Sequence, residues 1–290
     1  MSASIISNSK RLPVYYISHG GPTLVIDTHE NHHKFLKQLG SKIRKQFKPT
    51  AIVVVSAHWQ TTDIIRVSSF KDETPLIYDF YGFPDIMYQQ KYQNKGSPEL
   101  ASKIVDLLTE SKIDAVKDET RGFDHGVWVV LKLLFPEPGD VPIVQVSLKR
   151  DASFEFHIKV GKALESLREE GILLIGSGSL VHNLRDFFSD SNSPNMLPKQ
   201  YATTFDKDVT NIVKNFLGKE RENKLIDLKN HRFLKEAHPT TEHLVPLHVI
   251  AGAASEEKGE KIFHEIFSGM SSGAFSWGES KNDEVLRDEL

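Results

Sequence analysis

The chain contains no cysteine among its 290 residues. Disulfide bridges, thiolate metal sites and a cysteine nucleophile are therefore excluded. Any bound metal ion must be held by histidines and carboxylates. Thirteen histidines are present, so such a site is feasible.

Long apolar runs are also absent. No stretch approaches the roughly 18 apolar residues of a membrane-spanning helix, and the N-terminus lacks the apolar core of a signal peptide. We therefore expect a cytoplasmic protein that has no membrane partner. The last four residues, 287–290 (RDEL), resemble an ER-retention signal, which we interpret as a chance match because no signal peptide precedes it.

The chain carries no excess of positive charge. Its formal net charge is -3, so we expect no nucleic-acid partner. The 39% hydrophobic and 26% charged residues are ordinary for a soluble globular protein.

An internal repeat and a clear linker are missing as well. Strand and helix patterns alternate from residue 13 to residue 175. We therefore predict a single α/β domain over residues 1–290, with three αβα layers around a central, mostly parallel sheet.

Three of the apolar runs that are present lead into a histidine. Buried strands are expected at 13–17, 51–55 and 172–175, and the histidines that follow them are His19, His58 and His182. In open α/β sheets, ligands bind at the carboxyl ends of the strands. The recurrence favours a functional site, although a single histidine in such a place can also be a hydrogen-bonded structural residue.

Hydrophobic periodicity predicts the other elements. Helices are expected at 30–47, 97–111, 125–134, 154–170 and 199–217, and strands at 64–70, 113–116 and 141–148. Asp124 has the position of an N-cap, which places His125 in the first turn of a buried helix. A helix N-terminus disfavours the imidazolium form, so His125 is suited to bind or polarise an anionic ligand.

The remaining histidines fall into two groups. His238, Glu242 and His243 are all plausible ligands near a helix expected to begin at Pro239, and their spacing does not choose between them. We expect no functional role for the others. His29, His32 and His33 are expected on the solvent-exposed start of helix 30–47, and no motif surrounds His157, His231, His248 and His264.

Aromatic residues are concentrated in the loop 78–84, YDFYGFP. Such a loop either packs as a satellite core or forms the wall of a pocket for a flat substrate. Composition does not separate these two alternatives.

Five motifs, taken together, resemble the LigB-type (class III) extradiol ring-cleavage dioxygenases, in the branch of DOPA 4,5-dioxygenase and its bacterial relatives. In chain order they are SHGGP, SAHW, RGFDHG, GSGSLVHNLR and HPTTEHLVPLHVIAGAA. They extend from about residue 14 to residue 254. The resemblance implies a single α/β domain whose metal lies where strand-end loops converge.

The resemblance also implies roles for individual residues. The metal ligands would be His19, His58 and His243, with His182 as the acid and base and, in zinc-bound relatives, also drawn to the metal. His125 would contact the substrate. Fe(II) is expected for activity and Zn²⁺ can occupy the same site, while the partners would be a DOPA-like catechol and O2, in a monomer or homodimer.

Two features depart from the usual family pattern. Many non-haem iron sites use two histidines and one carboxylate, whereas here the third ligand would be His243 with Glu242 beside it. In addition, HNLRDF at 182–187 resembles the bacterial and general plant members, which leaves the particular catechol open.

The residue types suit this chemistry. Neutral imidazoles leave positions on Fe(II) where a catechol and O2 can bind side by side. A catechol must lose a proton to chelate well, and a histidine with a pKa near neutrality can take that proton and return it. His125 would stabilise developing negative charge.

Two other functions are alternatives to the dioxygenase hypothesis. A serine hydrolase is suggested by G-x-S-x-G around Ser271 and by the His19-Gly-Gly sequence, but no histidine follows Ser271 as the α/β-hydrolase order requires. A zinc-binding protein, either a metal-dependent hydrolase or a non-enzymatic ligand-binding protein, would use the same ligands.

Overall fold

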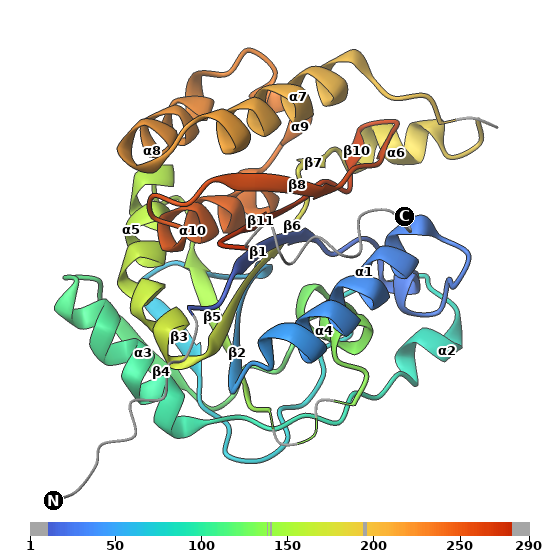
Figure 1. Cartoon of the computed structure of the whole chain (residues 1–290). Coiled ribbons are helices and arrows are strands. Elements are labelled where there is room, and N and C mark those ends of the chain that lie inside the picture. The colour runs from blue at the N-terminus through green and yellow to red at the C-terminus, as the bar shows by residue number, and fades with distance from the viewer. Residues whose placement is uncertain (1–10, 138, 140, 194–195, 280–290) are drawn as a thin grey trace, which may run out of the picture.

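A mixed sheet of eight strands runs through the part of the chain that the computed structural model describes, residues 11–137, 139, 141–193 and 196–279 (Figure 1). In spatial order the strands are β4 (Ala115–Asp118), β3 (Ile65–Ser68), β5 (Ile143–Lys149), β2 (Ala51–Thr61), β6 (Ile172–Gly178), β1 (Val14–Ser18), β11 (Ala274–Trp277) and β8 (Gly259–Phe263). The RDEL sequence lies outside the described residues.

The centre of the sheet is parallel and its flanks are mixed. Strands β5, β2, β6 and β1 pair in parallel, and β3 pairs with β4 in the same way. The β3–β5, β1–β11 and β11–β8 pairs are antiparallel. The predicted α/β fold with a mostly parallel sheet is therefore confirmed.

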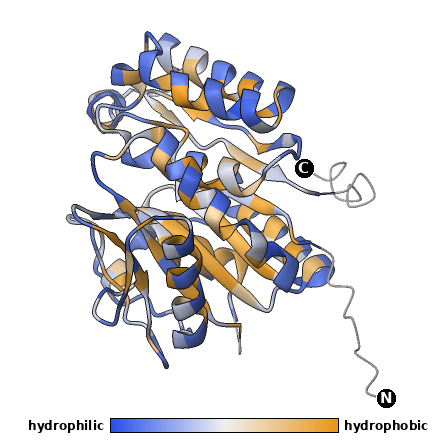
Figure 2. Cartoon of the chain, turned by 90° about the vertical axis from the view of Figure 1, so that its left-hand side faces the viewer, coloured by the Kyte–Doolittle hydropathy of each residue, from blue (hydrophilic) through white to orange (hydrophobic). Residues whose placement is uncertain are grey.

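Two layers of helices cover the sheet because its central strands are apolar on both faces. Val14 and Tyr16 of β1 belong to a core with α3 (Pro98–Glu110), α5 (Phe154–Leu164) and α10 (Val245–Ala253). Tyr15 and Ile17 belong to the opposite core with α1 (Asn31–Lys42) and α4 (His125–Leu134). Figure 2 shows apolar residues on the central strands and polar residues on much of the outer helices.

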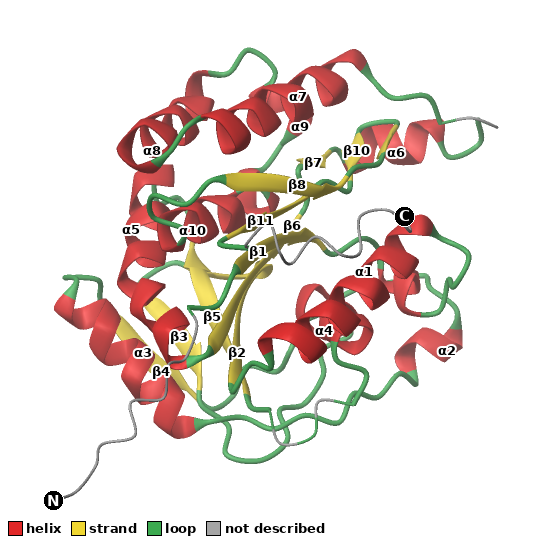
Figure 3. Cartoon of the chain, viewed as in Figure 1, coloured by secondary structure: helices red, strands yellow, loops and turns green. Residues whose placement is uncertain are grey.

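The remaining described elements surround the sheet (Figure 3). A small second sheet is formed by β7 (Val181–His182), β10 (Met270–Ser271) and β9 (Ile266–Phe267). The other helices are α2 (Asp85–Tyr88), α6 (Leu184–Asp190), α7 (Gln200–Asn215), α8 (Gly218–Asp227) and α9 (Leu234–Ala237). Short 3-10 or π turns are η1 (Pro22–Val25), η2 (Ile43–Phe47), η3 (Glu165–Glu170), η4 (Leu228–Asn230) and η5 (Thr241–His243).

Most predicted elements are present with altered ends. The predicted helix 30–47 is α1 continued by the π turn η2, and the predicted helix 154–170 is α5 continued by the 3-10 turn η3. The latter ends at Gly171, whose φ of 78° is left-handed and unfavourable for other residues. Ser97 caps α3 as expected, because its hydroxyl accepts from the Leu100 N–H.

Two predictions at helix starts are wrong. Pro239 does not open a helix; Pro246 lies in the first turn of α10 instead. His32 and His33 are buried, because His33 Nδ1 bonds the Leu24 carbonyl at 2.7 Å and the His32 ring stacks on Phe263. His29 is exposed as predicted.

Within the described residues, no helix combines the length and the apolar character needed to cross a bilayer.

Candidate metal and substrate site

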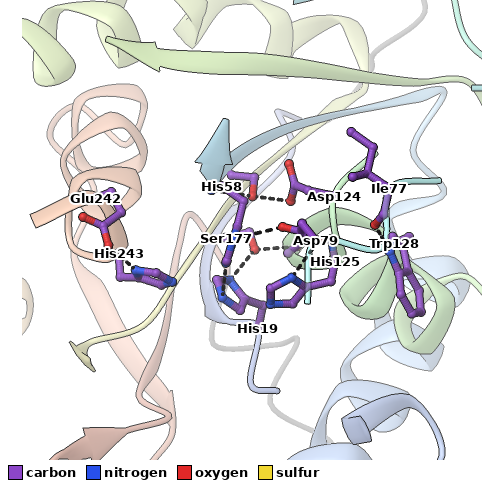
Figure 4. A network of polar contacts seen from close by, with 12 residues as sticks. His19, His58, Ile77, Asp79, Asp124, His125, Trp128, Ser177, Glu242 and His243 are labelled. Carbon is purple, nitrogen blue, oxygen red and sulfur yellow. Dashed lines mark hydrogen bonds and ion pairs between the residues drawn. The ribbon is translucent and has the colours of Figure 1, made fainter. Parts of the chain in front are cut away.

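Five histidines converge at the carboxyl end of the parallel strands, and Figure 4 labels four of them, His19, His58, His125 and His243. His19 follows β1, His58 lies in β2, His125 begins α4, His182 ends β7 and His243 ends η5. His19, His58 and His243 each offer a nitrogen within 4.8 Å of the other two. The structure thus brings together the three strand-end histidines with His125 and His243, whereas His238, which the sequence also singled out, lies outside this group.

The ring of His19 is fixed by the end of the neighbouring strand. Ser177 of β6 donates its hydroxyl hydrogen to the Gly126 carbonyl at 2.5 Å. The Ser177 hydroxyl oxygen lies 3.1 Å from His19 Nδ1. Because its hydrogen is donated to Gly126, this oxygen accepts a hydrogen bond from His19. His19 thus carries its proton on Nδ1 and presents the lone pair of Nε2 to the site.

The ring of His58 is also oriented through its Nδ1, in this case by a carboxylate. The pairing of β2 with β5 shifts register between Val55 and Gln60, so the strand is irregular where His58 lies. Its Nδ1 lies 3.1 Å from Asp79 Oδ2. Because a carboxylate only accepts hydrogen bonds, His58 Nδ1 is the donor and Nε2 again faces the site.

These two anchored rings face each other across a short distance. His58 Nε2 and His19 Nε2 are 3.1 Å apart, and two neutral rings would oppose their lone pairs there. A cation shared by both nitrogens removes this repulsion. Two imidazoles bound to one ion at about 2.1 Å place their nitrogens roughly 3.0–3.4 Å apart, so the separation fits a metal.

Without a metal, a proton is the cation available to this pair. Burial and the neighbouring imidazoles lower the pKa of His19 well below its usual value. The pKa of His58 is raised, because Asp79, Asp124 and Glu242 outweigh its burial. Protonation of His58 and metal binding therefore compete for the same nitrogen.

His243 completes the arrangement from the other side of the site. Its Nδ1 lies 3.0 Å from Glu242 Oε1, which leaves Nε2 directed away from that carboxylate. Nε2 is buried and has no hydrogen-bond partner, and burial beside other imidazoles lowers the pKa of the ring. An orphaned buried nitrogen with a free lone pair is suited to bind a metal.

The position of His243 depends on close backbone packing. Its carbonyl accepts from the Ser179 N–H at 3.0 Å and from the Tyr16 hydroxyl at 3.1 Å. A Cβ on Gly178 would lie 2.1 Å from the same carbonyl oxygen. Glycine at 178 is therefore required for η5 to approach the end of β6.

His182 lies against His243 and is held separately. Its backbone pairs with Met270 of β10, and the next residue, Asn183, donates to the Glu236 carbonyl at 2.8 Å. Burial, chiefly, lowers the pKa of His182 to about 3. The imidazole is therefore neutral near pH 7, but its pKa lies well below the near-neutral value expected for the acid and base, because the ring is buried.

His125 contacts Asp79 as well. Its Nδ1 and its backbone N–H both lie 2.9 Å from Asp79 Oδ1. Asp124, although it occupies the N-cap position, does not cap the helix with its side chain, which instead accepts from the Ser56 hydroxyl and the Gln145 amide. The predicted side-chain cap is thus replaced by Asp79.

A pocket of about 1430 Å³ contains all five histidines. Phe80, Tyr81 and Phe83 of the aromatic loop line it, whereas Tyr78 packs on Trp128 beneath them. Both alternatives for this loop therefore hold, because one part is core and the other is pocket wall. Across the pocket lie Leu184, Arg185, Phe187 and Phe188 of α6.

The sequence reasoning missed three supporting residues. Asp79 was present in the aromatic loop but its partners are distant in the chain, and Ser177 resembled any small residue at a strand end. Asn183 was read only as part of a motif. A search for hydrogen-bonding side chains next to strand-end histidines would have found Ser177 and Asn183, but no local signal marks Asp79.

The serine-hydrolase alternative has no support in this structure. The Ser271 hydroxyl is buried and donates to Asp206 Oδ2 at 2.6 Å. The same carboxyl group bonds Lys261 at 2.5 Å, and exposed His264 lies 3.7 Å from it. This is a structural network outside the pocket lining.

His238 is structural too. It is buried, its Nε2 lies 2.9 Å from the Leu180 carbonyl, and it does not line the pocket. Burial lowers its pKa to about 4, so the neutral ring supports the chain just before β7.

A mostly parallel α/β sheet with clustered imidazoles at its carboxyl edge is typical of α/β proteins that bind a small ligand at this edge. Within this class the chain belongs to the LigB family. The model of that family, the catalytic LigB subunit of aromatic ring-opening dioxygenase, matches residues 13–278. The chain is thus an extradiol ring-cleaving dioxygenase, an oxidoreductase.

Similar proteins cover almost the whole chain. The 4,5-DOPA dioxygenase extradiol of Beta vulgaris is 40% identical over 271 residues, which are 92% of this chain and 95% of that protein. The protein of the same name from Escherichia coli K12 is 36% identical over 252 residues, covering 86% and 88%. The crystal structure of an uncharacterized protein from Escherichia coli K12 aligns with a TM-score of 0.75 at 30% identity, covering 92% of this chain and 100% of that chain.

Proposed function

We propose that this chain is a metal-dependent extradiol dioxygenase that opens the ring of a DOPA-like catechol with O2. Fe(II) would be held by His19, His58 and His243, and Zn²⁺ would bind the same nitrogens. The relatives named 4,5-DOPA dioxygenase extradiol support the substrate class.

One observation carries the proposal. Two imidazoles turn their Nε2 lone pairs toward each other at 3.1 Å, and beside them His243 Nε2 is buried with no partner. In each of the three rings, Nδ1 contacts an oxygen of Ser177, Asp79 or Glu242, which orients Nε2 toward the site. The three neutral Nε2 atoms form a preorganised set of donors for a divalent metal.

A metal held by His19, His58 and His243 would supply the redox chemistry and the coordination positions for the catechol and O2. His182 takes the proton of a catechol hydroxyl: its ring is neutral and can accept a proton, while its lowered pKa makes it a weaker base than a free histidine. His125 stabilises negative charge on the deprotonated oxygen, held in place by two hydrogen bonds to Asp79. Phe80, in edge contact with the His125 ring, excludes water beside it.

The pocket also suits an amino-acid substituent on the ring. Arg185 and Lys235 line it together with Glu30 and Glu236, so both a carboxylate and an ammonium group find opposite charges. A benzoate, whose only charge lies directly on the ring, matches this arrangement less well.

Loading with Fe(II) under anaerobic conditions, followed by DOPA and air, tests the proposal. We expect oxygen uptake and the coloured ring-opened semialdehyde with Fe(II), and neither with Zn²⁺, because zinc has no redox chemistry. Metal binding with no turnover of any catechol would instead indicate a non-enzymatic metal-binding protein. Hydrolysis of an ester or amide by the zinc form would indicate a metal-dependent hydrolase.

A further inference from the structure

A single carboxylate joins two of the site histidines. Asp79 Oδ2 lies 3.1 Å from His58 Nδ1, and Asp79 Oδ1 lies 2.9 Å from His125 Nδ1. These histidines belong to different elements, β2 and α4, and their ring centroids are 4.1 Å apart. One oxygen of Asp79 thus contacts each of the two rings.

The aromatic loop holds this carboxylate in place. On one side of Asp79, the Tyr78 hydroxyl donates to the Gln90 carbonyl at 2.6 Å, and the Trp128 indole donates to the Ile77 carbonyl at 3.1 Å. On the other side, Phe80 is 6% exposed. The chain is therefore anchored immediately before and after Asp79, which limits movement of the carboxylate.

Asp79 Oδ1 also accepts the backbone N–H of His125 at 2.9 Å. That N–H is one of the free donors at the start of α4. The same oxygen thus fixes both the start of the helix and the ring of its first residue. This double contact sets the orientation of Asp79 even before the His58 contact is considered.

We infer that Asp79 is a positioning residue that sets the tautomer and orientation of both His58 and His125. An ionised carboxylate accepts and never donates, so each ring must place its proton on Nδ1 and direct Nε2 away from Asp79. For His58 this exposes the nitrogen proposed to bind the metal, and for His125 it exposes the nitrogen available to the substrate. The inference rests on the proposed function for these two consequences, but the tautomers themselves do not depend on it.

The tautomers can be read directly from protein labelled with ¹⁵N-histidine. Long-range ¹H–¹⁵N spectra would be recorded with a chelator present over a series of pH values, up to one at which His58, whose pKa is raised by the neighbouring carboxylates, is neutral. We expect the Nδ1–H form for His58 and His125 in the wild type. Assignment uses the loss of one set of signals in His58→Ala and in His125→Ala.

Asp79→Asn gives the most specific result. The backbone N–H of His125 needs an acceptor, so the side-chain oxygen of asparagine takes the place of Asp79 Oδ1. The amide NH2 group then faces His58. His58 then accepts from that amide and switches to the Nε2–H form, while His125 keeps Nδ1–H. Asp79→Ala removes both acceptors, so mixed tautomers are expected for both rings. Asp85→Asn, an exposed carboxylate in the same segment, is the matched control and should change neither ring.

Zinc affinity provides a second measurement. Removing a carboxylate that orients a metal-binding histidine typically weakens binding 10–100-fold, roughly, without changing the number of sites. We expect this for Asp79→Asn in isothermal titration with Zn²⁺, with one site retained and the affinity of Asp85→Asn unchanged. Circular dichroism and thermal unfolding identify a variant that fails to fold, and the isosteric Asp79→Asn is the variant to use in that case.

Three outcomes would overturn the inference. Unchanged tautomers in folded Asp79→Asn would show that other contacts orient the rings. Loss of the zinc site with wild-type tautomers would make Asp79 a metal ligand, and unchanged zinc affinity would mean that the orientation of His58 does not affect binding. If the wild type shows the expected tautomers but binds no metal, the proposed function fails while the assignment of the tautomers stands.

Discussion

The imidazoles of His182 and His243 stack face to face, with ring centroids 3.6 Å apart and planes inclined by 10°. His182 belongs to the small sheet, through β7, whereas His243 is tied to the end of the large sheet. After burial, His182 is the largest contributor to the depressed pKa of His243, and burial chiefly depresses the pKa of His182 itself. The proposed base and the proposed third ligand therefore favour the neutral form together.

This relationship leads to a prediction for His182→Ala. If His182 is the acid and base, the variant should fold and keep most of its iron while turnover falls by about 10²-fold or more, the usual effect of a positioned proton-transfer group. An acidic limb of the pH–rate profile near the lowered pKa of His182, about 3, should also disappear, because protonation of His182 would no longer inactivate the enzyme as pH falls. Iron content and steady-state oxygen uptake measure the two effects.

Other outcomes of that experiment are equally informative. Parallel loss of iron and activity would mean that His182 acts mainly as a ligand. Ring cleavage near the wild-type rate would exclude both roles and leave His125 as the candidate base. Phe188→Ala, a change to an exposed residue on the rim of the same pocket, serves as a control for general disturbance of the site.

Metal content should depend on His58. Elemental analysis of the wild type is expected to give about one equivalent of transition metal, and His58→Ala should give much less, because losing one of few ligands severely weakens a site. His264→Ala changes an exposed histidine that does not line the pocket and should keep the wild-type content. Retention of a full equivalent by His58→Ala would contradict the assigned ligands.

Substrate preference should follow the aromatic loop and the charges of the pocket. Oxygen uptake with DOPA, dopamine and protocatechuate is expected to be fastest, at equal subsaturating concentration, with DOPA, because its side chain carries both charges away from the ring. Dopamine, which lacks the carboxylate, should rank second. A clear preference for protocatechuate would rule out the DOPA-like substrate class and leave the ring-cleavage chemistry unaffected.

Stability at acid pH should depend on a histidine far from the site. His157 is buried, its Nδ1 lies 3.0 Å from the Ser153 carbonyl and its Nε2 accepts from the Lys149 N–H at 3.3 Å. Burial lowers its pKa to about 4, against an unfolded value of about 6.5. The unfolded state binds more protons between these values, so this contribution to stability is lost as pH falls from about 6.5 toward 4.

Urea unfolding of His157→Gln measures that contribution. At pH 5 the wild type should have lost about 2 kcal/mol of its unfolding free energy, relative to pH 7.5, through this residue alone. His157→Gln, which cannot titrate, should show a correspondingly smaller loss over the same pH interval. His29→Gln, at an exposed histidine, is the control, and an equal pH dependence in all three proteins would show that His157 does not carry the effect.

The sequence determined the strands and the histidines that end them. Apolar runs such as Val53–Val55 can be buried on both faces only inside a parallel sheet, and the chain leaves such a sheet at its carboxyl edge. His19, His58 and His182 were therefore predictable as neighbours, and the family motifs added His125 and His243. Their assigned chemical roles stay predictions that the experiments above address.

The tertiary structure decided what stands behind these histidines. Strand β6 lies between β1 and β2, with Ser177 aligned to Ile17 on one side and to Ser56 on the other, and only this order brings the Ser177 hydroxyl to His19. Asp79 reaches His58 and His125 because the aromatic loop is anchored on Trp128, and His32 is buried because Phe263, far along the chain, covers it. Contacts of this kind join residues from 21 to more than 200 positions apart, so they follow from the packing of whole elements and leave no mark in the local sequence.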